Sequence, residues 1–198
     1  MEHHLEKKYN RLKEIIGSMG RVLVAYSGGV DSTLLLKVAV DTLGDQHVLA
    51  VTALSPLYPE RELKGAKEIV QKLGTRQVLV ESNELEIDGF SKNPPNRCYY
   101  CKRELFRKMV KLAQQEGIPF IMEGSTLDDE KDHRPGRKAV QELGIRSPLQ
   151  EALFTKKEVR ELSNLLALST WDKPSFACLA SRFSLRGRGH PGGVKKGE

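Results

Sequence analysis

The sequence predicts an α/β fold in which a parallel sheet of about five strands carries helices on both faces. Short apolar segments alternate with longer amphipathic segments along most of the 198 residues. The distance between successive apolar segments leaves room for one helix each time, and glycine or proline marks several of the boundaries. Alternation of this kind is typical of a sheet built from right-handed strand–helix–strand units.

Five segments are predicted as strands because they are short, apolar and bounded by polar residues or glycine. In such a Rossmann-like sheet, ligands bind beyond the carboxyl ends of the strands, near the point where the strand order reverses. The pattern does not define that order. The predicted strands cover residues 21–26, 47–53, 77–80, 118–122 and, as a minimal strand, 145–148.

The segments that flank the strands have the periodicity of amphipathic helices. Pro59 stands near the first turn of one of them, and Gly74 stands just beyond its end, as helix boundaries prefer. Thr155 and Glu158 form a capping-box pattern at the start of the last helix. The predicted helices cover residues 2–17, 32–43, 59–73, 96–116, a short segment ending at 143, and 155–168.

Composition and charge are those of an ordinary folded domain. Apolar residues make up 39% of the chain and charged residues 29%, unlike the composition of disordered chains. The net charge of +6 fits an anionic ligand at least as well as a nucleic acid. No apolar run approaches the roughly 20 residues of a membrane span, and residues 1–8 lack the apolar core of a secretory signal. We therefore expect a cytoplasmic protein without membrane contact.

Residues 1–183 are expected to form one domain, in which residues 1–20 hold the N-terminal helix. Residues 184–198 differ from the rest, because they contain five glycines and show no periodicity. We expect this segment to be a flexible, disordered tail. The alternative is a truncated or altered end that replaces a longer region.

A glycine loop follows the first predicted strand and precedes a helix. Glycines let successive backbone N–H groups turn toward an anion, and the helix adds its positive N-terminal end. The two serine hydroxyls can donate to phosphate oxygens, and the aspartate can hold a magnesium ion. The residues predicted to bind phosphate here are Ala25, Ser27, Gly28, Gly29, Val30, Asp31 and Ser32.

The loop sequence Ser-Gly-Gly-Val-Asp-Ser is neither a Walker loop nor a dinucleotide fingerprint, because it lacks the required lysine and glycine spacing. It resembles the pyrophosphate loop (PP-loop) of the N-type ATP pyrophosphatases, which include GMP synthetase, NAD synthetase, asparagine synthetase and tRNA-thiolating enzymes. The resemblance implies an adenine nucleotide alpha hydrolase-like fold. It also implies that ATP, with Mg²⁺, adenylates a substrate and releases pyrophosphate.

The three cysteines are candidates for metal or thiol chemistry, which an odd number in a cytosolic chain favours over disulfides. Cys98 and Cys101 stand three residues apart at the start of a predicted helix, so both sulfurs can point the same way. The alternative for this pair is a structural, half-buried role. Cys178 lies in a segment of proline and small residues, and by itself fits a buried apolar cysteine equally well.

Two further segments make the resemblance more specific. RCYYCKRELF at 97–106 and DKPSFACLASRF at 172–183 resemble the ATP-dependent sacrificial sulfur transferases (LarE type), and the likeness runs from about residue 21 to 183. The resemblance implies that a carboxylate of pyridinium-3,5-biscarboxylic acid mononucleotide is adenylated. Cys178 then attacks, and the resulting thiocarboxylate serves synthesis of the nickel-pincer nucleotide, the cofactor of lactate racemase.

The family uses two sources of sulfur. In one, a single cysteine gives up its own sulfur and becomes dehydroalanine. In the other, three cysteines hold a [4Fe-4S] cluster that carries an extra sulfide. This sequence has the three-cysteine pattern of Cys98, Cys101 and Cys178, which favours the cluster. Zinc held by three thiolates and water is the inorganic alternative.

Other positions complete the predicted site. A polar loop after the fourth strand carries Gly124, expected near the nucleotide, and Asp128, a second candidate for magnesium beside Asp31. The family usually has asparagine where this chain has Thr126. Backbone groups at Thr52 and Ala53 could contact adenine. The residues expected to bind the substrate or its phosphate are Arg97, Arg134, Ser181 and Arg182.

The family continues beyond this region, into a part that supplies acidic and arginine residues and oligomer contacts, whereas here the likeness ends near Phe183. The resemblance implies a homo-oligomer. Two alternatives remain open: a tRNA-thiolating enzyme of the same superfamily, and an inactive remnant that binds a nucleotide or metal. The weak positive charge and the lack of basic–aromatic stretches argue against RNA.

Overall fold

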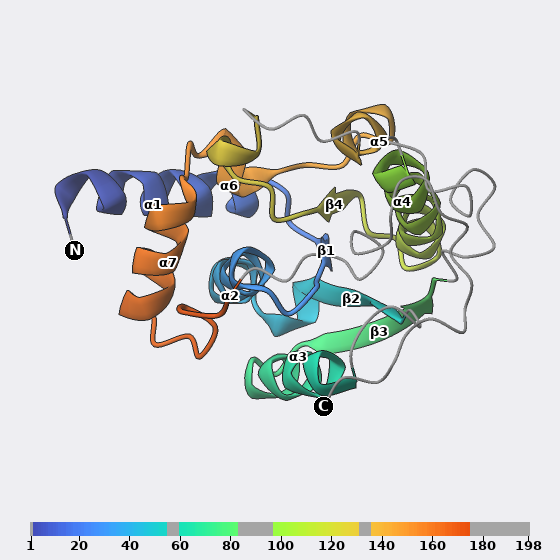
Figure 1. Ribbon diagram of the computed structural model, residues 1–198, viewed down its shortest axis with the longest axis horizontal. Helices are drawn as coiled ribbons and strands as arrows, with labels where there is room; N and C mark the ends of the chain where they lie inside the picture. The colour runs from blue at the N-terminus through green and yellow to red at the C-terminus, as the bar shows by residue number, and fades with distance from the viewer. Residues whose placement is uncertain (1, 55–59, 83–96, 131–135, 175–198) are drawn as a thin grey trace, which may run out of the picture.

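The computed structural model describes residues 2–54, 60–82, 97–130 and 136–174 (Figure 1). Its centre is a parallel sheet in the order β3-β2-β1-β4, which confirms the predicted α/β class. The described part of the chain forms four strands, where about five were expected. They are β1 (Val22–Ala25), β2 (Val48–Leu54), β3 (Arg76–Glu81) and β4 (Phe120–Met122).

The fifth predicted strand, at residues 145–148, is reduced to a single parallel bridge between Arg146 and Met122. Two backbone hydrogen bonds make this bridge, from Arg146 to Ile121 and from Glu123 to Arg146, both 2.9 Å long. Pro148 then begins the short helix α6 (Pro148–Glu151). Proline has no N–H for a ladder and a backbone suited to a first helical turn, so it ends the strand there.

Helices cover both faces of the sheet, as predicted (Figure 1). Successive residues of β1 point to opposite faces: Val22 and Val24 belong to one buried core and Leu23 to the other. The first core is covered by α1 (His3–Gly17), α2 (Val30–Leu43), α3 (Glu60–Lys72), α6 and α7 (Lys156–Leu165); the second is covered by α4 (Arg97–Gln115) and α5 (Gly136–Glu142).

Helix boundaries agree with the predictions to within a few residues, and three differences have local causes. The helix after the loop begins at Val30, because Gly29 adopts the extended cap conformation, which brings Asp31 and Ser32 into its first turn. A 3₁₀ turn (Asp45–His47) precedes β2 and another (Leu127–Glu130) follows β4. The capping box at Thr155 is confirmed, but α7 ends before Ala167, whose φ of 54° breaks the helix.

The strand order reverses between β1 and β4, because β2 and β3 lie on one side of β1 and β4 on the other. The glycine loop follows β1 at its carboxyl end and therefore lies at the switch point of the sheet, where α/β proteins bind ligands. Among the described helices, none is both long and apolar enough to cross a bilayer.

Candidate active site

The glycine loop is closed by its own serines. Ser32 Oγ accepts a hydrogen bond from the Ser27 N–H at 3.2 Å and donates to the Gly29 carbonyl at 3.2 Å, while the two serine hydroxyls lie 3.1 Å apart. Gly28 has a φ of 70°, a conformation that only glycine adopts without a steric penalty. The loop is therefore a preformed turn that leads directly into the first turn of α2.

Gly124, at the end of β4, packs against this loop. A Cβ atom at this position would lie 3.1 Å from the Ser32 nitrogen and 3.2 Å from the Asp31 carbonyl carbon. Both atoms belong to the backbone and cannot move aside easily. Glycine is thus required for β4 to approach the loop, whereas contact of Gly124 with a nucleotide remains a prediction.

Asp31 lies in the first turn of α2 with about a fifth of its side chain exposed. Its Oδ2 forms a short ion pair with the Lys156 ammonium of α7. Burial raises the pKa of Asp31, and the hydrogen bond and charge of Lys156 oppose that rise. Its Oδ1 is buried and accepts no hydrogen bond from the described residues. An orphaned carboxylate oxygen beside a phosphate loop fits the coordination of Mg²⁺.

Lys156 also connects Asp31 to the second predicted magnesium ligand, because its backbone N–H donates to Asp128 Oδ2 at 2.5 Å. Asp128 is exposed. Next to it, the buried Thr126 donates both its N–H and its hydroxyl to Asp129 Oδ2, at 2.8 and 3.0 Å. The threonine that departs from the family pattern therefore stabilises the turn after β4. Magnesium binding by Asp128 stays a prediction.

A second lysine reaches the loop from the segment after α7. The Lys173 ammonium donates to the Gly28 carbonyl at 2.9 Å and lies 2.5 Å from Glu62 Oε2 of α3. Neither Lys156 nor Lys173 was among the predicted site residues. In the sequence, Lys156 is distinguished only by its place next to the capping box, and Lys173 only by its place in the segment that contains Cys178. The chain has 32 lysine and arginine residues, so position alone does not indicate which of them contact the loop.

The residues predicted to lie near adenine are at the ends of β1 and β2. Thr52 is almost completely buried, and its hydroxyl accepts a hydrogen bond from Gln77 at 2.9 Å. Ala53 and Ala25 are half-buried. The chain after β1 stays beside β2, because the Tyr26 N–H donates to the Val51 carbonyl at 2.8 Å. Contact of these residues with adenine stays a prediction.

Cys98 and Cys101 lie in the first turns of α4, with Cys98 exposed and Cys101 half-buried. The start of α5 packs against this turn, since a Cβ at Gly136 would lie 3.2 Å from the Cys98 carbonyl oxygen. Two sulfurs three residues apart on a helix suit a shared metal or cluster. Within the described residues no third metal-binding side chain joins them.

Arg97 begins α4. The remaining predicted site residues, Arg134, Cys178, Ser181 and Arg182, and the predicted tail at 184–198 lie outside the described residues.

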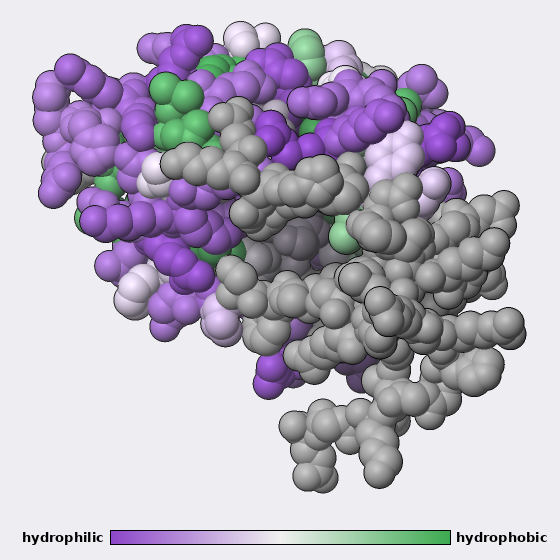
Figure 2. Space-filling view, turned by 45° about the horizontal axis from the view of Figure 1, so that its top comes forward, coloured by the Kyte–Doolittle hydropathy of each residue, from purple (hydrophilic) through white to green (hydrophobic). Residues whose placement is uncertain are grey.

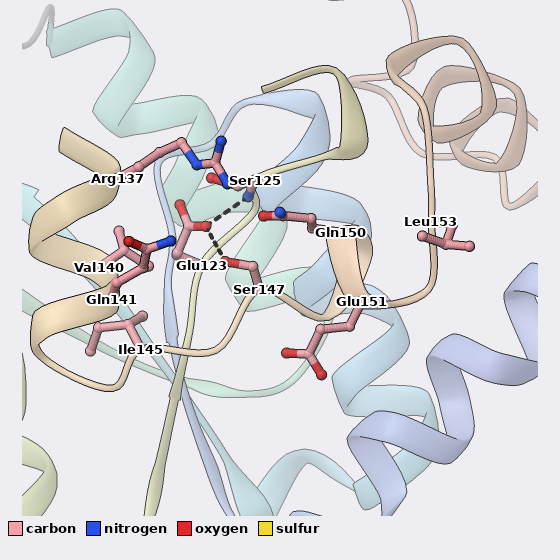
Figure 3. Close-up of a pocket in the computed structure, with 10 residues that line it drawn as sticks. All are labelled: Glu123, Ser125, Arg137, Val140, Gln141, Ile145, Ser147, Gln150, Glu151 and Leu153. Atoms are coloured by element: carbon pink, nitrogen blue, oxygen red, sulfur yellow. Dashed lines mark hydrogen bonds between the residues drawn. The ribbon is translucent and has the colours of Figure 1, made fainter. Parts of the chain in front are cut away.

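A pocket of about 380 Å³ opens beside the loop, between the end of β4, α5 and α6 (Figure 3). The buried Glu123 carboxylate lies in it and accepts hydrogen bonds from the Ser125 N–H at 3.0 Å and the Ser147 hydroxyl at 2.6 Å. Glu123 and Ser125 flank Gly124, so the pocket adjoins the loop. On the face drawn in Figure 2, hydrophilic residues cover most of the described surface, and apolar residues form only small patches.

Comparison with known proteins places this site in a family. A family model described as NAD synthase matches residues 5–93. The pyridinium-3,5-bisthiocarboxylic acid mononucleotide synthase of Lactiplantibacillus plantarum is 38% identical over 179 residues, which cover 90% of this chain and 65% of that enzyme. An uncharacterized protein of Methanocaldococcus jannaschii is 30% identical over 90% of this chain and 67% of its own length. The chain belongs to the LarE-type family of PP-loop enzymes.

Two more similarities support the family and the fold. An uncharacterized protein of Synechocystis sp. is 46% identical over 90% of this chain and 66% of its own length. The chain thus spans about two thirds of the length of these curated relatives. The NMN synthetase structure from Francisella tularensis has a TM-score of 0.65 over 90% of this chain and 76% of that chain. At 17% identity it shows the shared PP-loop fold alone.

Proposed function

We propose that this chain adenylates a carboxylate of pyridinium-3,5-biscarboxylic acid mononucleotide with ATP and then transfers sulfur to it, for synthesis of the nickel-pincer nucleotide. The observation that carries the proposal is the PP-loop at the switch point of the sheet, with the orphaned Asp31 oxygen in its first helical turn. The substrate follows from the relative in Lactiplantibacillus plantarum, a pyridinium-3,5-bisthiocarboxylic acid mononucleotide synthase.

In the first step, a substrate carboxylate oxygen attacks the α-phosphorus of ATP, the bond to the β-phosphate breaks and pyrophosphate leaves. The backbone N–H groups between Ser27 and Ser32, with the positive end of α2, would hold the departing pyrophosphate. These donors are fixed before the reaction, so they stabilise the developing charge without reorganisation. Lys156 would add positive charge from α7.

Asp31 would hold Mg²⁺ through its unpartnered Oδ1. When bound, the ion neutralises negative charge on the pyrophosphate. Asp31 would then share its charge between the ion and Lys156. Asp128 is the second candidate ligand, held close by the Lys156 N–H.

In the second step, a sulfur nucleophile attacks the acyl carbon of the adenylate, a C–S bond forms and AMP leaves. In the sacrificial route the nucleophile is the Cys178 thiolate. A β-elimination then removes the Cα proton of Cys178 and breaks its Cβ–S bond, so that the sulfur leaves as the thiocarboxylate and dehydroalanine remains. In the other route Cys98, Cys101 and Cys178 would hold a [4Fe-4S] cluster that supplies the sulfide. The shared helical turn of Cys98 and Cys101 supports the cluster route.

Pyrophosphate release by the full chain tests the adenylation step. With Mg²⁺ and ATP, release should require the dicarboxylate mononucleotide and should not respond to tRNA. Release that requires tRNA would support the RNA-thiolating alternative, and ATP binding without any turnover would support the inactive remnant. Either result would contradict the proposal.

Intact mass after turnover identifies the sulfur source. Loss of one sulfur from Cys178 indicates the sacrificial route, and an unchanged mass with bound iron and sulfide indicates the cluster. Colourless, iron-free protein after anaerobic purification would remove the cluster route.

The proposal also places the enzyme in the cytoplasm as a homo-oligomer. Family resemblance supports the oligomer, and sedimentation of the purified chain tests it.

A further inference from the structure

Lys173 makes a contact that the adenylation chemistry does not itself require. Its ammonium donates to a backbone carbonyl, that of Gly28, at 2.9 Å. The same ammonium is 2.5 Å from Glu62, a carboxylate that is only 9% exposed. A lysine that bridges a buried carboxylate and one loop carbonyl restrains that carbonyl in a single direction.

The direction of the Gly28 carbonyl determines the direction of the next amide. The Gly28–Gly29 peptide is planar and trans, so its C=O and N–H point in opposite directions. With the carbonyl on Lys173, the Gly29 N–H is turned away from Lys173. Within the described residues, it donates to no acceptor, and it stands at the cap of α2. This amide is therefore available to an anion at the helix N-terminus.

This peptide needs an external restraint. It joins two glycines, and neither carries a Cβ that would hinder rotation of the peptide plane. Ser32 bonds the Gly29 carbonyl, one peptide further along, and the Ser27 N–H, two peptides back, and leaves the Gly28 carbonyl untouched. Within the described residues, only Lys173 forms a hydrogen bond with the Gly28 carbonyl.

Lys173 is itself held at both ends. Arg160 of α7 donates to the carbonyl oxygens of Trp171 at 2.9 Å and Lys173 at 2.8 Å, which fixes the backbone, and Glu62 of α3 fixes the ammonium. In Figure 1 the segment after α7 curves back toward the start of α2. Two helices thus cooperate to present one ammonium group to the loop.

We infer that Lys173 is a positioning residue that locks the Gly28–Gly29 peptide with its N–H toward the pyrophosphate, and that Glu62 acts through Lys173. The inference rests on the proposed function, since it assigns pyrophosphate to the PP-loop. Without the ammonium, the peptide rotates freely, and a rotated peptide would present a carbonyl oxygen to the anion in place of a donor.

Titration of the full chain with Mg²⁺-pyrophosphate and, separately, with AMP tests the inference. Lys173→Met keeps the length of the side chain and removes the charge. Affinity for pyrophosphate should fall at least about tenfold, the size of a lost charged hydrogen bond. Affinity for AMP should stay within about twofold, because AMP lacks the two phosphates that leave. A general loss of structure would lower both affinities.

Two further variants make the test specific. Glu62→Gln should weaken pyrophosphate binding less than Lys173→Met, and should add nothing further in the double variant, because it acts through the same lysine. Lys37→Met is the matched control. The Lys37 side chain is about as exposed as that of Lys173, and its ammonium lies 2.6 Å from the Asp41 carboxylate. Within the described residues, Lys37 forms no hydrogen bond or ion pair with the loop. It should bind pyrophosphate like the unaltered chain.

The outcomes separate this inference from the proposed function. If the unaltered chain fails to bind Mg²⁺-pyrophosphate, the assignment of the loop is wrong. If it binds, and Lys173→Met binds equally well, or loses AMP and pyrophosphate affinity in parallel, then Lys173 does not position the peptide.

Discussion

The two halves of the proposed active site are organised differently. The PP-loop is local: Ser27, Gly29 and Ser32 bond one another within six residues, and the helix that follows starts in the same turn. The thiol half is not local, because Cys98 and Cys101 share one turn of α4 while Cys178 lies far along the chain. The turn of the PP-loop can therefore be encoded by a short segment, whereas the sulfur chemistry depends on assembly of distant segments.

Removal of one thiol from α4 should have the largest effect, because it should abolish sulfur transfer and leave adenylation intact. In Cys98→Ala, formation of thiocarboxylate should be lost, because three thiolates are needed to hold the cluster. Pyrophosphate release should stay within about twofold, because the PP-loop does not use this residue. Product analysis beside a pyrophosphate assay measures both. Unchanged thiocarboxylate formation would indicate that Cys178 acts alone.

Asp31→Asn should disable the phosphate half. The amide cannot replace the carboxylate as a magnesium ligand, and the ion pair with Lys156 is lost. Substrate-dependent pyrophosphate release should fall at least about a hundredfold. Asp41→Asn, which changes an exposed carboxylate on the same helix, is the control. Equal rates for the two variants would argue against a role for Asp31.

Gly124→Ala tests how closely β4 must approach the loop. The added Cβ would lie 3.1 Å from the Ser32 nitrogen, so the loop or β4 must shift. Unfolding free energy should fall by about 1–3 kcal/mol, and pyrophosphate release should fall about tenfold. Gly65→Ala meets no atom within 4 Å and lies in α3, where alanine should stabilise the protein by up to about 1 kcal/mol. If Gly124→Ala and Gly65→Ala have the same unfolding free energy and the same rate of pyrophosphate release, β4 does not need a glycine to pack against the loop.

Glu158 supports the start of α7, which carries Lys156, and should affect stability more than chemistry. Burial raises its pKa, but hydrogen bonds from Lys8, Thr155 and His4 outweigh burial and lower the pKa to about 2. A carboxylate with a depressed pKa stabilises the fold above its unfolded value of about 4.5, and that stability is lost as pH falls toward 2.

Glu158→Gln should therefore cost about 2–3 kcal/mol of unfolding free energy at neutral pH. The difference from the unaltered chain should shrink between pH 4.5 and 2. Denaturant unfolding at several pH values measures this change. If the difference in unfolding free energy does not depend on pH, the charge of Glu158 is not the source of the stabilisation.

Local patterns were sufficient to predict six of the described helices, four strands and the loop, whereas the short helix α6 was not predicted. The 3.6-residue repeat and the capping box at Thr155 depend only on neighbours in sequence, and the structure reproduces both. The fifth predicted strand is reduced to one bridge, because Pro148 has no N–H for a ladder and begins α6 instead. Lys156 and Lys173 were not predicted, because each meets its loop partner across more than a hundred residues.

The sequence by itself determined an α/β chain with a phosphate-binding turn, since glycine conformations and helix termini are properties of short segments. Only the tertiary structure decided where that turn lies, between β1 and β4, and which charges face it. Strand order is set by the packing of whole helices on a sheet, and an ion pair forms wherever that packing brings two side chains together. For that reason Asp31 was predictable as a ligand, whereas its lysine partner was not.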